Sequence, residues 1–163
     1  MFSAYKVLAD HTIAGLDLAD LDASYDNVSW GDWSADDLVV TYVSGDVRLA
    51  GKGVGAGVLV VDGTLEMAGQ FEFTGLVIVK GDVTVTGGGQ GTHIWGSLLV
   101  NETVSLIDAF KVEGQADIYY STEALEGVEK MASISAGSYE TVYYGEIQPG
   151  SASYQSEIEV VTK

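Results

Sequence analysis

Residues 57–87, GVLVVDGTLEMAGQFEFTGLVIVKGDVTVTG, decide the fold, because a glycine stands at every sixth position. The same beat extends backwards to Gly51 and Gly45. Each glycine opens a block of six residues, and in most blocks the third and fifth positions are both apolar. These pairs are Val47 and Leu49, Leu59 and Val61, Leu65 and Met67, Phe71 and Phe73, Val77 and Val79, and Val83 and Val85. Apolar residues at a period of two predict a short strand in each block with these side chains on one face, and the glycine predicts a corner.

Three strands of six residues predict a rung of about 18 residues. The blocks GVLVVD (57–62) and GLVIVK (75–80) resemble each other, as expected for segments one rung apart. At GGGQGTHIW three additional residues interrupt the six-residue glycine spacing, which predicts a local extension of the chain. One corner of successive rungs is therefore expected at Gly57, Gly75, Gly96 and Gly114, with spacings of 18, 21 and 18. The predicted fold class is mainly β: a short single-stranded parallel β-helix of about four or five rungs, with a C-terminal helix and hairpin packed on it.

The outward positions of the blocks predict two different walls. In the blocks that begin at Gly45, Gly63 and Gly81 they are mainly polar or charged, which is typical of a solvated wall. In the blocks that begin at residues 57, 75 and 96 they are mainly apolar, and this candidate packing or interface wall consists of Val58, Val60, Leu76, Ile78 and Leu99. A sheet that is apolar on both faces is covered by something. The cover is either another subunit or this chain's own flanks, which we favour because about 80 residues lie outside the repeat.

The chain is expected to form one structural domain with three zones. Residues 1–37 are an acidic, aromatic N-terminal flank or cap with short elements, and residues 38–120 are the β-helix repeat. Residues 121–163 are expected to pack on the β-helix. They begin with a helix over 121–133, with Ser121 as N-cap. Two strands follow, YETVYYGEI and YQSEIEVV, with a turn at Pro149–Gly150.

The charge limits the classes of ligand. The chain has 7 lysines and arginines against 24 aspartates and glutamates, a formal net charge of -17, which repels nucleic acid and anionic lipid surfaces. Calcium is the one cofactor that this charge favours, and the acidic segment YDNVSWGDWSADD offers Asp26, Asn27, Asp32, Asp36 and Asp37. Their spacing is not that of an EF-hand loop, so a solvated acidic loop is the favoured interpretation. Because the chain has no cysteine, thiol chemistry is excluded.

No pattern in the sequence indicates catalysis, and we expect a protein that is not an enzyme. TGGGQGTH lacks the lysine and the following helix of a phosphate-binding loop, and the histidines fall in no triad or zinc pattern. Paired carboxylates of the glycosidase kind are disfavoured because the chain has a single arginine, Arg48, to bind an acidic sugar. His93 and Trp95 are the candidate surface-loop aromatics. Trp30, Trp33 and Trp95, with the nine tyrosines, are candidates for a sugar-stacking or partner surface, and the favoured alternative is that these aromatics lock the flanks onto the core. Tyr119 and Tyr120, with Tyr143 and Tyr144, are expected to pack the flanks onto the core.

The quoted repeat, followed by VEGQADIYYSTEAL, resembles the C-terminal domain of PilX-type proteins, which are pilin-like accessory proteins of bacterial type IV pilus systems. The likeness covers roughly residues 40–126 and includes a G-x-A-x-I-x-Y-S segment, here Gly114, Ala116, Ile118, Tyr120 and Ser121. The resemblance implies a glycine-rich β-helical core with a role in pilus assembly, adhesion or surface display, and it implies no catalytic residue. Family members begin with an apolar pilin-type helix, and this chain has no comparable apolar stretch and no recognisable signal peptide.

The expected function is therefore a non-catalytic structural or assembly module of a type IV pilus-like or cell-surface system. We expect it in the cell envelope or outside the cell, with a cytoplasmic location as the alternative. Protein partners or self-association are expected, without membrane insertion by this chain. Two further hypotheses remain: a self-assembling filament subunit that resembles bactofilins, and a carbohydrate-binding β-helix.

Overall fold

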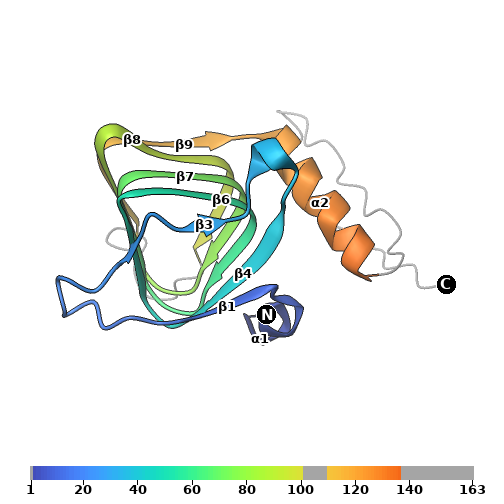
Figure 1. Ribbon diagram of the computed structural model, residues 1–163, viewed down its shortest axis with the longest axis horizontal. Coiled ribbons are helices and arrows are strands. Elements are labelled where there is room, and N and C mark those ends of the chain that lie inside the picture. The colour runs from blue at the N-terminus through green and yellow to red at the C-terminus, as the bar shows by residue number, and fades with distance from the viewer. Residues whose placement is uncertain (1, 101–109, 137–163) are drawn as a thin grey trace, which may run out of the picture.

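The chain forms a parallel β-solenoid of about four turns, as the sequence predicts. The computed structural model describes residues 2–100 and 110–136 (Figure 1). Three short strands and a 3-10 turn follow the N-terminal helix: α1 (Phe2–Leu8), β1 (His11–Ala14), β2 (Tyr25–Asp26), β3 (Ser29–Trp30) and η1 (Trp33–Ala35). The longer strands and the second helix are β4 (Val39–Ser44), β5 (Val47–Ala50), β6 (Lys52–Val61), β7 (Leu65–Val79), β8 (Val83–Val100), β9 (Phe110–Tyr120) and α2 (Thr122–Ala136).

Neighbouring coils pair in parallel, with the corner glycines in register. Gly57 pairs with Gly75 across a coil of regular length, and Gly75 pairs with Gly96 across a coil that is three residues longer. The additional residues form a bulge in β8, between the pairs that Gly69 and Glu72 make with it. The predicted slip of three residues at this point is confirmed. Positive φ angles at Gly57, Gly75 and Gly96 explain why these corners are glycine.

The fourth predicted corner is wrong. Gly96 pairs with Tyr120, and Gly114 instead pairs with Gly87 at a different corner. Val79 and Val83 are four residues apart, whereas their partners Val100 and Phe110 are ten residues apart. The last coil is thus six residues longer at this connection. Because six is also the repeat length, Gly114 still falls on the six-residue spacing counted from Gly96, although the coil has shifted by one corner.

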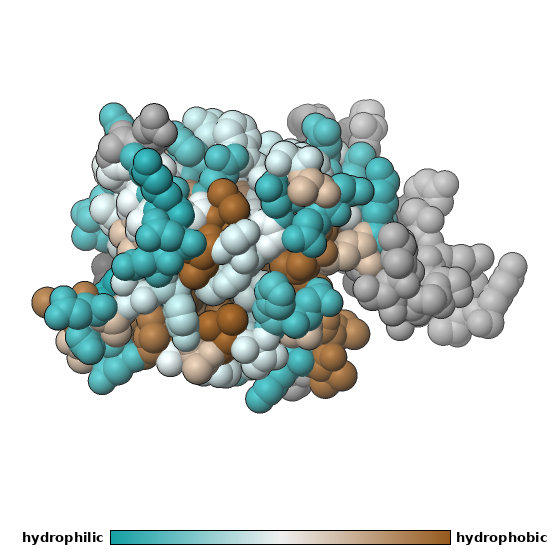
Figure 2. Space-filling view, viewed as in Figure 1, coloured by the Kyte–Doolittle hydropathy of each residue, from teal (hydrophilic) through white to brown (hydrophobic). Residues whose placement is uncertain are grey.

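The interior consists of the predicted inward pairs. Their side chains are all at most 1% exposed, and each buried Val, Leu or Phe stabilises the fold by about 1.5–3 kcal/mol. The inward positions of the block GKGVGA are glycines, because the rings of the next coil occupy the space. A Cβ atom at Gly53 would lie 2.5 Å from Cδ2 of Phe71, and one at Gly55 would lie 2.6 Å from Cδ2 of Phe73. On the face seen in Figure 2, hydrophobic residues lie near the centre and along the lower margin, with hydrophilic residues between them.

The N-terminal flank contributes a coil of its own. β1 pairs in parallel with β4, β2 with β5 and β3 with β6. Residues 11–30 therefore extend the solenoid beyond the expected repeat at 38–120. Gly15 lies against Gly45, since a Cβ atom at Gly15 would lie only 2.9 Å from Cα of Gly45. The close glycine contact at this corner thus continues into the first coil.

The two helices of the described residues, α1 and α2, cover the candidate wall except at Leu99. Val58, Val60 and Ile78 are at most 5% exposed and form one apolar cluster with Tyr42 of β4 and Val128 of α2. The other side chains packed on this cluster come from α1 and the connection after it, from α2 and from the strands themselves: Phe2, Tyr5, Ala9, Met131, Val40 and Leu76. Figure 1 shows α2 running along the outside of the strands. Leu99, the last member of the predicted wall, is 48% exposed.

Helix α2 begins as predicted. The backbone N–H of Ala124 donates a hydrogen bond to the Ser121 hydroxyl at 3.2 Å, so Ser121 caps the helix. Glu123 adds a negative charge to the first turn, where the helix dipole favours it. The two strands and the turn at Pro149–Gly150 that were expected after this helix lie outside the described residues.

Candidate functional site

An exposed aromatic surface runs along the outside of the last coils. In register, Thr74 of β7 pairs with Trp95 of β8, and Trp95 pairs with Tyr119 of β9. The rings of Trp95 and Tyr119 stack with their centroids 4.4 Å apart and an interplanar angle of 17°. The ring of His93 lies 6.3 Å from both. We call His93, Trp95 and Tyr119 the aromatic face. Trp95 is 39% exposed and Tyr119 is 42% exposed, so this face is open to solvent.

The structure corrects two expectations about these residues. His93 and Trp95 lie on strand β8 and not in a loop, because the bulge ends before them and the register resumes where Glu72 pairs with His93. Tyr119 and Tyr120 do not pack a flank onto the core, since Tyr119 stacks on Trp95 at the surface and Tyr120 is 76% exposed at the end of the last strand. Tyr143 and Tyr144 lie outside the described residues.

Carboxylates adjoin the aromatic face. Glu72, His93 and Asp117 occupy one column of neighbouring strands, and Nδ1 of His93 lies 3.5 Å from Oδ2 of Asp117. A hydrogen bond with Asp117 raises the pKa of Tyr119, because the nearby carboxylate opposes ionisation of the phenol. This face therefore combines π surfaces with negative charge.

A hollow of about 240 Å³ opens next to the aromatic face. Its lining comes from η1, β7, β8 and the start of α2: Trp33, Glu72, Thr74, Trp95, Ser121, Glu123 and Ala124. Trp33, which lies in η1 between β3 and β4, is 37% exposed and lies against Gly127 of α2. The sequence names Trp33 and Trp95 as candidate surface aromatics, but it does not predict that they line one hollow with Glu72 and Glu123, because these residues are widely separated along the chain.

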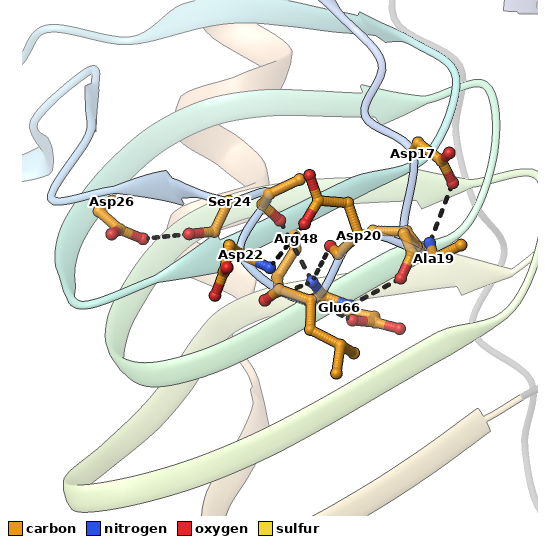
Figure 3. A network of polar contacts seen from close by, with 11 residues as sticks. Asp17, Ala19, Asp20, Asp22, Ser24, Asp26, Arg48 and Glu66 are labelled. Carbon is orange, nitrogen blue, oxygen red and sulfur yellow. Dashed lines mark hydrogen bonds and ion pairs between the residues drawn. The ribbon is translucent and has the colours of Figure 1, made fainter.

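Arg48 is engaged in a structural contact (Figure 3). Its Nε donates to Oε2 of Glu66 at 2.7 Å. The guanidinium Nη atoms donate to four backbone carbonyls of the N-terminal acidic segment at 3.0–3.2 Å, those of Leu18, Asp20, Leu21 and Ala23. The only arginine of the chain thus holds this segment on the sheet and gives hydrogen-bond partners to carbonyls that no strand pairs.

The residues considered for calcium serve turns instead. Asp32 caps η1, accepting hydrogen bonds from the backbone N–H of Ser34 at 2.8 Å and from its hydroxyl at 2.6 Å, and the hydroxyl contact lowers the pKa of Asp32. Oδ1 of Asn27 accepts from the N–H of Lys52 at 2.8 Å. Asp36 ends η1 in the left-handed conformation, Asp37 pairs with the backbone of Asp32, and Asp26 accepts from Ser24. In the part of the chain that the structure describes, no three carboxylate or histidine groups converge as a metal site.

A second polar contact, which is partly buried, lies beside the apolar wall. The hydroxyl of Tyr42 donates to Oδ2 of Asp62 at 2.9 Å, and Nζ of Lys80 donates to Oδ1 at 2.6 Å. The hydrogen bond from the Lys80 ammonium, with that from Tyr42 second, lowers the pKa of Asp62 below its ordinary range. Burial raises the pKa of Tyr42. These groups bind one another across neighbouring coils, and their geometry is that of a structural contact.

The fold and these surfaces define a parallel β-solenoid protein with an open aromatic face. No protein-family model, curated protein or solved structure matched the chain when compared with it. Within residues 2–100 and 110–136, neither helix has the length and apolar character needed to cross a bilayer.

Proposed function

We propose that this protein is a non-catalytic structural module of a bacterial type IV pilus-like or cell-surface assembly. The observation that carries the proposal is the use of its charged groups: Arg48 and the Asp62 cluster bind neighbouring coils to one another. A solenoid whose apolar wall is covered by its own helices is a rigid block, which suits a structural role. The likeness to PilX-type domains supports the pilus assignment, because its signature segment coincides with β9 and the cap of α2.

The test is the location and partners of the protein in its natural host. An epitope-tagged chain is expressed from its own locus, and the sheared surface fraction, envelope and cytosol are probed separately. We expect the tag in the envelope or sheared fraction, cross-linked to other envelope proteins. A tag found only in the cytosol, beside a cytosolic marker, would contradict the proposal.

The last coils favour a second candidate, a filament subunit that resembles bactofilins. Their inward side chains Leu98, Val100 and Ile118 are only partly buried, and Val112 is 42% exposed. Leu98, Val100 and Ile118 line an open hollow of about 460 Å³ at this end of the solenoid. No strand among the described residues pairs with the outer edge of β9. An exposed strand edge over apolar side chains is a template for another copy of the chain.

Electron microscopy and light scattering separate the two candidates. If copies stack end to end, concentrated protein forms filaments, and Val112→Lys abolishes them because it places a charge in the joint. Thr84→Lys is the matched control, since Thr84 points outward one coil away. A stable monomer at all concentrations contradicts the filament hypothesis.

A further inference from the structure

The hollow beside the aromatic face is walled by two tryptophans. Tyr119 covers one face of the Trp95 indole, and the opposite face looks towards Thr74, whose short side chain leaves it open. At the other wall, Trp33 rests against α2: a Cβ atom at Gly127 would lie 2.7 Å from Cζ3 of Trp33. Glycine at position 127 therefore leaves the room that the Trp33 ring occupies. Both indoles are held in place by neighbours and remain more than a third exposed.

The charged side chains that line the hollow are negative. Among the described residues they are Glu72 and Glu123, with no lysine or arginine in the lining. The first turn of α2 also borders the hollow, and Glu123 offsets the positive end of that helix. The whole chain carries a net charge of -17, which adds to the negative potential. An anion is repelled from this place, and a cation is attracted to it.

We propose that the hollow between Trp33 and Trp95 binds a quaternary ammonium group. Such a group is large and weakly hydrated, so it gains contact with indole faces by the cation–π interaction at little cost of desolvation. The carboxylates of Glu72 and Glu123 supply the counter-charge without requiring a hydrogen-bond donor on the ligand. The same chemistry is present in free choline and in the headgroup of a choline lipid.

Titration with choline, followed by tryptophan fluorescence and calorimetry at constant ionic strength, tests the proposal. We expect saturable binding, weakened by roughly tenfold in Trp95→Ala and in Trp33→Ala because each removes one cation–π contact. Trp95→Phe retains a ring and is expected to bind with intermediate affinity. The melting temperature of each variant verifies that it is folded.

Two comparisons test the contribution of charge to binding, one by removing the charge of the ligand and one by removing the charge of Glu123. The neutral isostere 3,3-dimethyl-1-butanol has the shape of choline without its charge, and it is expected to bind at least tenfold more weakly. Glu123→Gln is expected to weaken choline binding several-fold, whereas Glu126→Gln, on the same helix but outside the hollow, leaves it unchanged. Equal binding of the isostere, or no binding of choline by folded protein, overturns the proposal. Binding of methyl glucoside without choline overturns it in favour of the carbohydrate hypothesis.

Vesicles distinguish the two sources of the ligand group. Flotation with phosphatidylcholine vesicles that is competed by free choline identifies the lipid headgroup as a ligand. Binding of free choline without flotation identifies a soluble ligand. Both results support the site, and Trp95→Ala is expected to weaken either one by roughly tenfold.

Discussion

Gly53 is required by the volume of its neighbour and not by its backbone conformation. Its φ is not positive, so an alanine fits the backbone, but the Cβ atom would lie 2.5 Å from the ring of Phe71. We predict that Gly53→Ala lowers the free energy of unfolding by about 1–3 kcal/mol through overpacking. Chemical denaturation measures the change. Gly88→Ala is the control, because the nearest atom to a Cβ there lies 3.9 Å away. Equal stability of the two variants contradicts this explanation.

The hydrogen bonds of Arg48 require the shape of the arginine side chain as well as its charge. A lysine keeps the charge but cannot reach four carbonyls and Glu66 at once, since an ammonium lacks the planar fork of donors. We predict that Arg48→Lys costs about 1–3 kcal/mol and speeds hydrogen exchange in residues 16–24. Glu66→Gln removes only the ion pair and is expected to cost less. If Glu66→Gln costs as much as Arg48→Lys, the carbonyl contacts contribute nothing.

Asp62 gives the protein an acid-sensitive contact. Because its folded pKa is lowered, the contact contributes its full stability above the ordinary aspartate pKa of about 3.9 and loses it as the pH falls through the folded value. We predict that Asp62→Asn is less stable than the wild type at pH 7 and that this difference shrinks below about pH 4. Unfolding curves at several pH values measure it. A difference that does not change down to about pH 2 excludes this linkage.

At the scale of elements, α2 is attached to the solenoid through one apolar stripe. Val128 is 8% exposed and packs on the wall formed by Val58, Val60 and Ile78. We predict that Val128→Asp releases α2, because a buried unpaired carboxylate is more costly than exposing the helix. The expected loss is about 2–3 kcal/mol.

Hydrogen exchange followed by mass spectrometry distinguishes release of the helix from unfolding of the molecule. In Val128→Asp, exchange is expected to accelerate in α2 and in the wall strands that it covers, while the inward positions of β7 and β8 remain protected. Glu129 lies on the exposed side of the same helix, so Glu129→Ser is the control. Unchanged protection of α2 would show that the wall does not hold it.

The six-residue periodicity of the sequence predicts the elements that repeat, and it does not predict the elements that depart from this spacing. The strands, their inward side chains and the apolar wall all follow from a period of two within a period of six. The shift at Gly114 has the length of one block, so no count of glycines can detect it. The sequence does not predict the first coil, because the number of residues between paired positions changes along it. More residues separate β1 from its partner β4 than separate β2 from its partner β5, so no single period describes this coil. Trp33 and Trp95 line the same hollow only because the folding of the intervening coils brings them together.

At the scale of the whole molecule, a neutral interior is enclosed by a strongly anionic surface. Arg48, Lys80 and Lys111 each form an ion pair with a carboxylate of the described residues. Even with every cation of the chain paired, the excess of 17 negative charges remains. Folding brings these charges closer together than they are in the unfolded chain, so their mutual repulsion opposes the compact state.

Salt is therefore expected to stabilise the protein. The Debye length falls from about 30 Å at 0.01 M salt to about 10 Å at 0.1 M, which screens most of the repulsion between exposed carboxylates. We predict that the melting temperature rises by at least about 3 °C over this range, the shift that about 1 kcal/mol produces in a chain of this size. Sucrose of equal osmolality does not screen charge and is the control. The double variant Glu126→Lys/Glu129→Lys replaces two exposed negative charges of α2 by positive ones, which changes the net charge from -17 to about -13, and it should gain less from salt. A melting temperature that is constant or falls with salt would mean that local contacts, and not the overall charge, govern its stability.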